Sequence, residues 1–327
     1  MKRSFIGLTA AFASMLVAAA TAQAQDRTLK LIVPSSAGGV HDVIGRLWAD
    51  GLKPALGSIV IDNRGGGGGS IGVGEAQRAT PDGTTFLLGS NSSQILQPVV
   101  FKASGKALSY DPIDDFEIVS VFALTSTAIA VAPTLPVKSL KEFIALLRAN
   151  PDKYNYAHGG VGTVSNVSAE LFKQLAGDLK VRPVSYRGMG PAQADVINGT
   201  LEMFLPNITG QVVELHATGK IKVLSVNAPK PHPSMPEIPT SEAAGLPGMI
   251  AQSFFAILAP KGTPRADVDR VNSATRAAVS EKSFQERLAK SGFEPLEGYD
   301  PVRSRAYMKS EHVRWEAIVK SANVKQP

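Results

Sequence analysis

The sequence contains no cysteine. This absence excludes disulfide bonds, thiolate metal ligands and a cysteine nucleophile. Aromatic residues are sparse at 6%, and lysine and arginine are scattered singly rather than in runs. The net charge is +6, or +4 (6 − 2) without Lys2 and Arg3. Without a basic patch interleaved with aromatics, nucleic acid is not expected as a partner. A mildly positive field instead suits anionic solutes.

Long apolar runs are also missing after the first 24 residues. Residues 1–24 have the pattern of a signal peptide, with Lys2 and Arg3 before an apolar stretch over residues 5–20. Ala22-Gln23-Ala24 fits the small-residue cleavage pattern, so we expect cleavage before Gln25 and a periplasmic protein. A membrane anchor is the alternative, but the run is short and rich in alanine.

Hydrophobic residues, in contrast, make up 44% of the 327 residues, and glycine (30) and proline (22) are plentiful. This composition predicts a packed core with many defined turns. The length allows one large domain or two ordinary ones. No repeat of solenoid period is visible.

Short strand-like and helix-like segments alternate along the chain, which predicts an α/β fold with largely parallel sheets. Ser139 is a plausible N-cap, and residues 229–247 are proline-rich and read as irregular. The strands are expected at residues 29–33, 59–61, 85–88, 119–131, 182–186, 201–205, 223–226 and 251–258. The helices are expected from residue 43, at 71–79, 140–147, 164–175 and 192–198, and over most of 265–324, with a turn at 187–191.

Two glycine-rich loops, residues 34–42 and 158–165, each follow a predicted strand and precede a predicted helix. Such a loop exposes backbone N–H groups beside the positive end of a helix dipole, which favours an anion. Glycine lets a ligand approach the backbone closely. If both loops lie at the carboxyl ends of parallel strands, they border a crevice. Ordinary strand-to-helix turns remain the alternative.

The run of glycines at residues 65–69 creates two motif matches. Gly67-x-Gly69-x-x-Gly72 fits the dinucleotide fingerprint, but a suitable acidic residue about 20 positions later is missing. The segment from Gly68 to Gly72 also fits G-x-S-x-G around Ser70, but that serine does not directly follow a strand. The five histidines are not at metal-ligand spacing. We therefore expect neither a cofactor nor a metal.

Several motifs in one order resemble the Bug family, the periplasmic solute-binding components of tripartite tricarboxylate transporters. The likeness extends from residue 31 to about residue 315. The motifs are Val33-Pro34 with Gly38-Gly39-x-x-Asp42, Asp62-Asn63-Arg64, Pro81-Asp82-Gly83, Gly160-Val161-Gly162-Thr163, Glu170-Leu171-Phe172, Tyr186-Arg187-Gly188, Pro239-Thr240-x-Glu242-x-x-Gly245-Leu246-Pro247 and Ala259-Pro260-x-Gly262-Thr263-Pro264.

The resemblance implies a two-lobe periplasmic-binding-protein type II-like fold with a ligand cleft between the lobes. Residues 25–125 and 251–327 would form lobe 1, and residues 126–250 would form lobe 2. Residues 119–131 and 251–258 would cross between the lobes at the hinge, and the C-terminal helices would complete lobe 1. A small carboxylated solute would be captured without catalysis and delivered to membrane subunits of the transporter.

The resemblance places the carboxylate on the same two loops. The candidate ligand-binding residues are Ser35, Ser36, Gly38, Gly39, His41, Asp42, Ser90, His158, Gly160, Gly162, Thr163 and Asn207. The chain departs from the family at His41 and His158, where small hydroxyl residues are usual, and at Asn166, where histidine is common. The two imidazoles are either drift in solvent-facing loops or ligand contacts from opposite lobes. In the second case anion binding would weaken as pH rises, or the rings would stack on an aromatic acid.

Two other classes stay open. An exported sensor would use the same binding module to report to a signalling protein. An exported hydrolase would use Ser35, Ser36, Ser70 or Ser92 with His41 or His158, although no orienting carboxylate is evident apart from Asp42. The ligand itself is equally open among aliphatic dicarboxylates, tricarboxylates, amino acids and aromatic acids.

Overall fold

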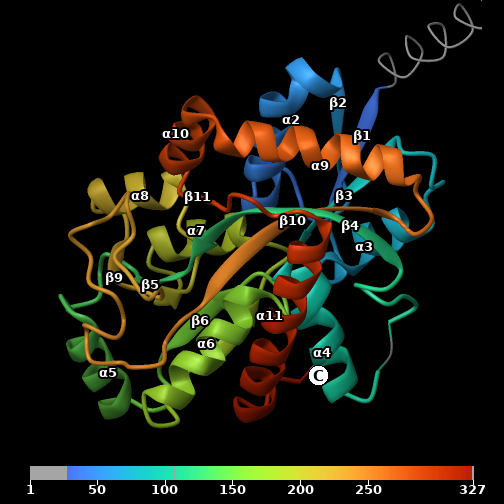
Figure 1. The fold of residues 1–327 in the computed structure, drawn as a ribbon. Coiled ribbons are helices and arrows are strands. Elements are labelled where there is room, and N and C mark those ends of the chain that lie inside the picture. Colours follow the sequence, from blue (N-terminus) through green and yellow to red (C-terminus); the bar gives the residue numbers. More distant parts are fainter. Residues whose placement is uncertain (1–27, 107, 326–327) are drawn as a thin grey trace, which may run out of the picture.

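A computed structural model describes residues 28–106 and 108–325 of the chain. The chain forms two β-sheets with helices packed around each (Figure 1). The first sheet has the strand order β11-β4-β10-β3-β1-β2, and the second has the order β7-β6-β8-β5-β9. Both sheets mix parallel and antiparallel pairs. The predicted α/β class is confirmed, but the expectation of largely parallel sheets is wrong, because β10 and β11 in the first sheet and β5 in the second pair antiparallel.

The first sheet collects strands from both ends of the chain. Its members are β1 (Leu29–Val33), β2 (Ile59–Asn63), β3 (Thr85–Ser90), β4 (Phe116–Ser126), β10 (Gln252–Pro260) and β11 (Glu294–Pro295). Alternate side chains of β1 enter different cores: Leu29, Leu31 and Val33 enter one, and Ile32 enters the other. This alternation follows from the two-residue period of a strand covered on both faces.

Helices cover both faces of the first sheet. One face packs against α2 (Val40–Leu56), α9 (Arg265–Ser280) and α10 (Lys282–Lys290). The other packs against α3 (Ser70–Gln77), the π-helical turn η2 (Ser92–Leu96), α4 (Gln97–Ala103) and α11 (Pro301–Ser321). A 3-10 turn, η1 (Gly67–Gly69), precedes α3.

The second sheet is built from the middle of the chain. Its strands are β5 (Ala128–Val131), β6 (Asn155–His158), β7 (Arg182–Ser185), β8 (Met203–Phe204) and β9 (Lys222–Val226). Its helices are α5 (Leu140–Ala149), α6 (Val164–Leu175), α7 (Met189–Ile197) and α8 (Gly210–Ala217). Ser139 caps α5 as predicted, since its hydroxyl accepts a hydrogen bond from the N–H of Glu142.

The chain passes between the sheets at two adjacent points. Only Thr127 separates β4 in the first sheet from β5 in the second. Its N–H donates to the carbonyl of Ala251, just before β10, and its carbonyl accepts from the N–H of Asn227, just after β9. The first crossing thus lies within the predicted stretch 119–131. The predicted lobe boundaries at 125/126 and 250/251 lie next to these crossing points. The boundaries themselves stay predictions.

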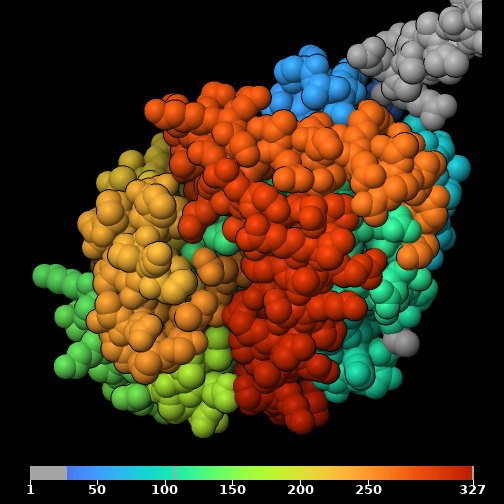
Figure 2. Space-filling model, viewed as in Figure 1, coloured from blue at the N-terminus to red at the C-terminus, as the bar shows by residue number. Residues whose placement is uncertain are grey.

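The C-terminal helix α11 contacts both halves of the molecule. It packs against β4, η2 and α4 on one side and against α6 on the other. In Figure 2 its red side chains lie between the teal residues of the first half and the yellow-green residues of α6. One continuous apolar cluster joins Met308, Trp315 and Val319 of α11 to Phe143 and Phe172 of the second half. Helix α11 therefore contacts more than the predicted lobe 1.

Several elements differ from the sequence prediction. Helix α7 begins at Met189, so the predicted turn at 187–191 is partly helical and Pro191 lies in the first turn, where its missing N–H removes no intrahelical bond. Strand β8 has only two residues, Met203 and Phe204. The segment from Ser92 to Ala103, helix α8 and strand β11 were not predicted. None of the helices within the described residues has the length and apolarity needed to cross a membrane.

Candidate ligand-binding cleft

The first predicted loop connects the carboxyl end of β1 to the N-terminus of α2. Gly39 is the N-cap, and no side chain caps the helix. Within the described residues the N–H groups of Val40 and His41 have no partner, as the geometry of a first helical turn dictates. The loop therefore presents unpaired donors at the positive end of a 17-residue helix.

Asp42 holds this loop in shape rather than facing outward. Its Oδ2 accepts hydrogen bonds from the N–H of Gly38, at 2.9 Å, and from Arg46, at 3.0 Å. Burial alone would raise the pKa of Asp42, but the bonds from Arg46 and Gly38 outweigh it and hold that pKa below its ordinary value. The Gly38 N–H is thus occupied inside the loop.

The run of glycines packs directly against the first loop. A methyl carbon added to Gly65 would lie 2.9 Å from the backbone nitrogen of Ser36, and one added to Gly72 would lie 2.9 Å from Cα of Pro34. Gly66 and Gly68 also have positive φ angles, 121° and 66°. Close contact with the first loop and positive φ angles therefore account for these four glycines without a dinucleotide. Ser70 begins α3 after the η1 turn, so it is not on a strand-borne elbow.

His41, in the first turn of α2, meets Ser90, the last residue of β3. Nε2 of His41 lies 2.8 Å from the hydroxyl of Ser90, and its ring meets Phe255 edge-on with centroids 5.4 Å apart. Burial lowers the pKa of His41 to about 4. This imidazole is therefore neutral near pH 7. Because Asp42 turns toward Gly38 and Arg46, it does not orient the His41 ring in the manner of a catalytic triad.

The second predicted loop connects β6 to α6, with Thr163 as N-cap. The loop is held by its own side chains: Nδ1 of His158 accepts from the N–H of Gly160 at 3.2 Å, and Oδ1 of Asn166 accepts from the N–H of Gly162 at 3.1 Å. The hydroxyl of Thr163 donates to the Gly160 carbonyl at 2.6 Å. Burial lowers the pKa of His158, although the negative charge of Glu170 acts in the opposite direction. His158 supports the loop from within.

A buried polar chain lies beneath the second loop. Nδ2 of Asn166 donates to the hydroxyl of Tyr156 at 3.1 Å, and that hydroxyl donates to the carboxylate of Glu170. Lys173 pairs with Glu170 at 2.8 Å. Burial and the neighbouring Glu170 raise the pKa of Tyr156, so it stays protonated as the donor. Asn166 thereby connects the loop backbone to an ion pair on α6.

Residues of the η2–α4 segment, which follows β3 of the first sheet, contact the second loop and the start of α6. The Ser92 hydroxyl accepts a hydrogen bond from the N–H of Val164, the first residue of α6, at 3.1 Å. Nε2 of Gln97 donates to the carbonyl of Val161 at 2.5 Å. The carboxyl edges of the two sheets therefore border one cleft. From the sequence, Ser92 was expected only as a possible nucleophile and Gln97 was not singled out, although the polar residues directly after the apolar strand β3 were a usable signal.

The remaining predicted residues lie at or near this cleft. Asn207 follows β8, and its Oδ1 accepts from the hydroxyl of Ser253 on β10 at 2.7 Å. The hydroxyl of Ser35 donates to the carbonyl of Ser36 at 3.3 Å, and Ser36 is exposed. Which of the predicted residues touch a ligand stays a prediction.

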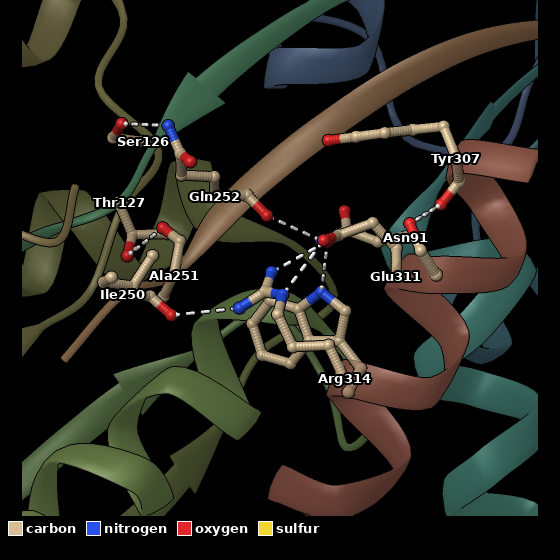
Figure 3. A network of polar contacts seen from close by, with 11 residues as sticks. Asn91, Ser126, Thr127, Ile250, Ala251, Gln252, Tyr307, Glu311 and Arg314 are labelled. Atoms are coloured by element: carbon tan, nitrogen blue, oxygen red, sulfur yellow. Dashed lines mark hydrogen bonds and ion pairs between the residues drawn. The ribbon is translucent and has the colours of Figure 1, made fainter. Parts of the chain in front are cut away.

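A polar network connects the hinge to α11 on the other side (Figure 3). Arg314 donates to the carbonyl of Ile250 at 3.3 Å and pairs with Glu311 at 2.7 Å. The amide of Asn91 donates to the carbonyl of Gln252 at 2.7 Å (Figure 3). These contacts attach α11 and the end of β3 to the segment at which the chain changes sheet.

Other kinds of site have little support. Within the described residues no group of three or more histidine, aspartate or glutamate side chains is placed to hold a metal ion. Two surface hollows, of about 520 and 500 Å³, lie beside α9 and between α9 and α11. Neither is lined by a residue of the two loops. The cleft between the loops is therefore the candidate site.

The fold and the cleft define a two-lobe periplasmic binding protein. Residues 44–324 match the family model described as the tripartite tricarboxylate transporter family receptor. The chain belongs to this family, and the resemblance to Bug proteins is confirmed.

Relatives in sequence agree with this assignment. The chain is 29% identical to protein BugT of Bordetella pertussis over 91% of this chain and 90% of that protein. It is also 30% identical to a UPF0065 protein from the tcbD-tcbE intergenic region of Pseudomonas sp. (strain P51), over 90% of this chain and 85% of that protein.

Solved structures confirm the two-lobe fold. Rpa4515 of R. palustris with adipate superposes with a TM-score of 0.87 at 31% identity, covering 92% of this chain and 98% of that one. MatC from Rhodopseudomonas palustris with bound malate has a TM-score of 0.83 at 29% identity, covering 90% of this chain and 99% of that one. The periplasmic binding protein BugD has a TM-score of 0.83 at 27% identity, covering 92% and 99%.

Proposed function

We propose that this protein captures a small carboxylated solute between its two loops and delivers it to the membrane subunits of a tripartite transporter. The observation that carries the proposal is the pair of helix N-termini, α2 and α6, which belong to different sheets and border one cleft. The similar structures that hold adipate and malate support a carboxylate as the ligand.

The carboxylate binds through backbone donors rather than a cationic side chain. The unpaired N–H groups of Val40 and His41 point from the start of α2. Each such helix-terminus contact stabilises an anion by about 0.3–1 kcal/mol when exposed and by up to about 2 kcal/mol when partly buried. Several contacts and burial of the solute's apolar part must therefore act together.

Closure of the lobes completes the site. The bonds from Val164 to Ser92 and from Gln97 to Val161 form only when the two halves are close together. They exclude water from the cleft, which strengthens every polar contact inside it. Capture in this way requires no chemical step.

The location follows from the same proposal. A receptor of this family works outside the cytoplasm, and the signal peptide expected at residues 1–24, with cleavage before Gln25, lies outside the described residues. The transporter's membrane subunits would take the solute from the closed form.

A thermal-shift screen of the chain from Gln25 onward tests the proposal. The panel contains aliphatic dicarboxylates, tricarboxylates, amino acids and aromatic acids. A ligand at about a hundred times its Kd stabilises the protein by about 2.7 kcal/mol, which raises the Tm by several degrees. The expected result is such a rise with at least one acid and binding of one intact molecule per chain by calorimetry. No shift with any acid would reject a carboxylate ligand, and turnover of a bound ester would indicate a hydrolase instead.

A further inference from the structure

Gln97 lies between the glycine run at residues 65–69 and the second loop. It begins α4 and is fully buried, and its Nε2 donates to the carbonyl of Val161 in the second loop at 2.5 Å. A methyl carbon added to Gly68 would lie 1.7 Å from this nitrogen, and one added to Gly162 would lie 3.0 Å away. The amide therefore occupies the space between the glycines of one lobe and the ligand loop of the other.

The other end of this amide has no partner. A carbonyl oxygen can only accept, so the bond to Val161 fixes Nε2 on that side and leaves Oε1 on the other. Oε1 is buried and makes no hydrogen bond within the described residues. A buried acceptor left unpaired costs about 1–3 kcal/mol. Such an atom in a native protein calls for a partner from outside the chain.

We propose that Gln97 is the specificity-determining residue of the cleft and that its Oε1 accepts a hydrogen bond from the solute. The preferred solute is then a carboxylate with a second polar group that donates, a hydroxyl or an ammonium, rather than a plain carboxylate. This inference rests on the proposed function and narrows its ligand class. A plain dicarboxylate leaves Oε1 unpaired in the closed cleft, whereas a hydroxy or amino acid satisfies it.

Two neighbouring amides have the same unpaired oxygen but a different position. Gln94 donates through Nε2 to the carbonyl of Pro112 at 2.5 Å, and Asn91 donates to the carbonyl of Gln252 at the hinge. Neither of these bonds reaches the second loop. Of the three amides, only that of Gln97 bonds to the second loop, and Gln94 provides a matched control.

The experiment measures affinity by calorimetry for pairs of acids that differ only in the donor. The pairs are succinate with malate, succinate with aspartate, and glutarate with 2-hydroxyglutarate. In the wild-type protein the donor-bearing acid of at least one pair should bind about tenfold more tightly, the ratio that about 1.4 kcal/mol produces. In Gln97→Met, which keeps the length of the side chain without the acceptor, that ratio should fall to about one. In Gln94→Met it should persist.

The possible results distinguish a failure of the inference from a failure of the proposed function. Equal affinities within every pair in the wild-type protein would overturn the inference and leave carboxylate capture standing. A ratio that persists in Gln97→Met would overturn it too. If no acid binds, the proposed function fails and the inference fails with it. Should Gln97→Met not fold, Gln97→Asn keeps an amide shorter by one methylene, and its ratio must still drop.

Discussion

At the scale of single residues, the two histidines are held by contacts within the protein. Both imidazoles have a lowered pKa because they are buried, and His158 accepts a bond from Gly160 within its own loop. They are therefore neutral near pH 7 in the ligand-free protein. The hypothesis that a charged imidazole meets the anion stays a prediction, and it now requires the ligand to raise these pKa values.

His41 should make the protein less stable in mild acid. Its pKa is about 4 in the folded protein and about 6.5 when unfolded, so the unfolded chain binds more protons between these values. The stability that neutral His41 contributes is complete above about pH 6.5 and is lost as the pH falls toward about 4. His41→Gln, which can still bond to Ser90, should show a smaller fall in Tm between pH 7 and 4.5. If the curves of Tm against pH were parallel for the two proteins, the loss of stability in mild acid would not come from His41.

At the scale of elements, the sequence predicted best where one periodic pattern ran unbroken. The bounds expected for the first strand and for the helix at 164–175 agree with β1 and α6, because their apolar residues follow a clear period and their ends carry turn residues. Strand β8 was overestimated, because the apolar run from Leu201 also covers a turn. Periodicity does not show which part of an apolar run forms hydrogen bonds with a neighbouring strand.

The site was predictable in part for a related reason. Glycine loops before helices are local signals, so both candidate loops were located from the sequence. The bond from Gln97 to Val161 joins residues 64 positions apart, and the bond from Ser92 to Val164 joins residues 72 positions apart. No local pattern marks a partner at that distance. The residues that join the lobes therefore came only from the structure.

Helix α3 offers a test of how tightly the first loop is held. Gly72→Ala would place a methyl carbon 2.8 Å from the Arg64 carbonyl and 2.9 Å from Cα of Pro34, both backbone atoms that cannot move independently. We expect a loss of about 1–3 kcal/mol in the free energy of unfolding and weaker ligand binding, because the loop after β1 shifts.

The matched control is Gly74→Ala on the same helix. Its methyl carbon would come closest to the flexible end of Arg78, at 3.2 Å, and would make an ordinary contact with Tyr110 at 3.9 Å. Because alanine favours a helix over glycine by about 1 kcal/mol, this variant should be neutral or more stable. Urea unfolding of both variants measures the difference, and equal stabilities would contradict the close packing of Gly72 against Pro34.

At the scale of the whole molecule, α11 makes the two halves share one core. Trp315 is fully buried in a cluster that includes Ile32 of the first sheet and Phe172 of α6. Arg314 also bonds to the hinge at Ile250. The halves are therefore connected by apolar burial as well as by the two crossing points of the chain.

Unfolding should accordingly be a single cooperative event. Calorimetry of the ligand-free protein should show one transition with equal calorimetric and van't Hoff enthalpies, because neither half can keep its share of the common core alone. Two resolved transitions would mean that α11 stabilises only one of the two halves.

The bond between Ser92 and Val164 has a consequence for how strongly any solute can bind. The hydroxyl of Ser92 already occupies the first N–H of α6, at 3.1 Å. It acts as an internal competitor, since an anion that uses this N–H must first displace it. The apparent Kd is then the intrinsic Kd divided by the fraction of molecules in which the N–H is free. One hydroxyl thereby weakens capture and eases release, which suits a protein that must give its cargo away.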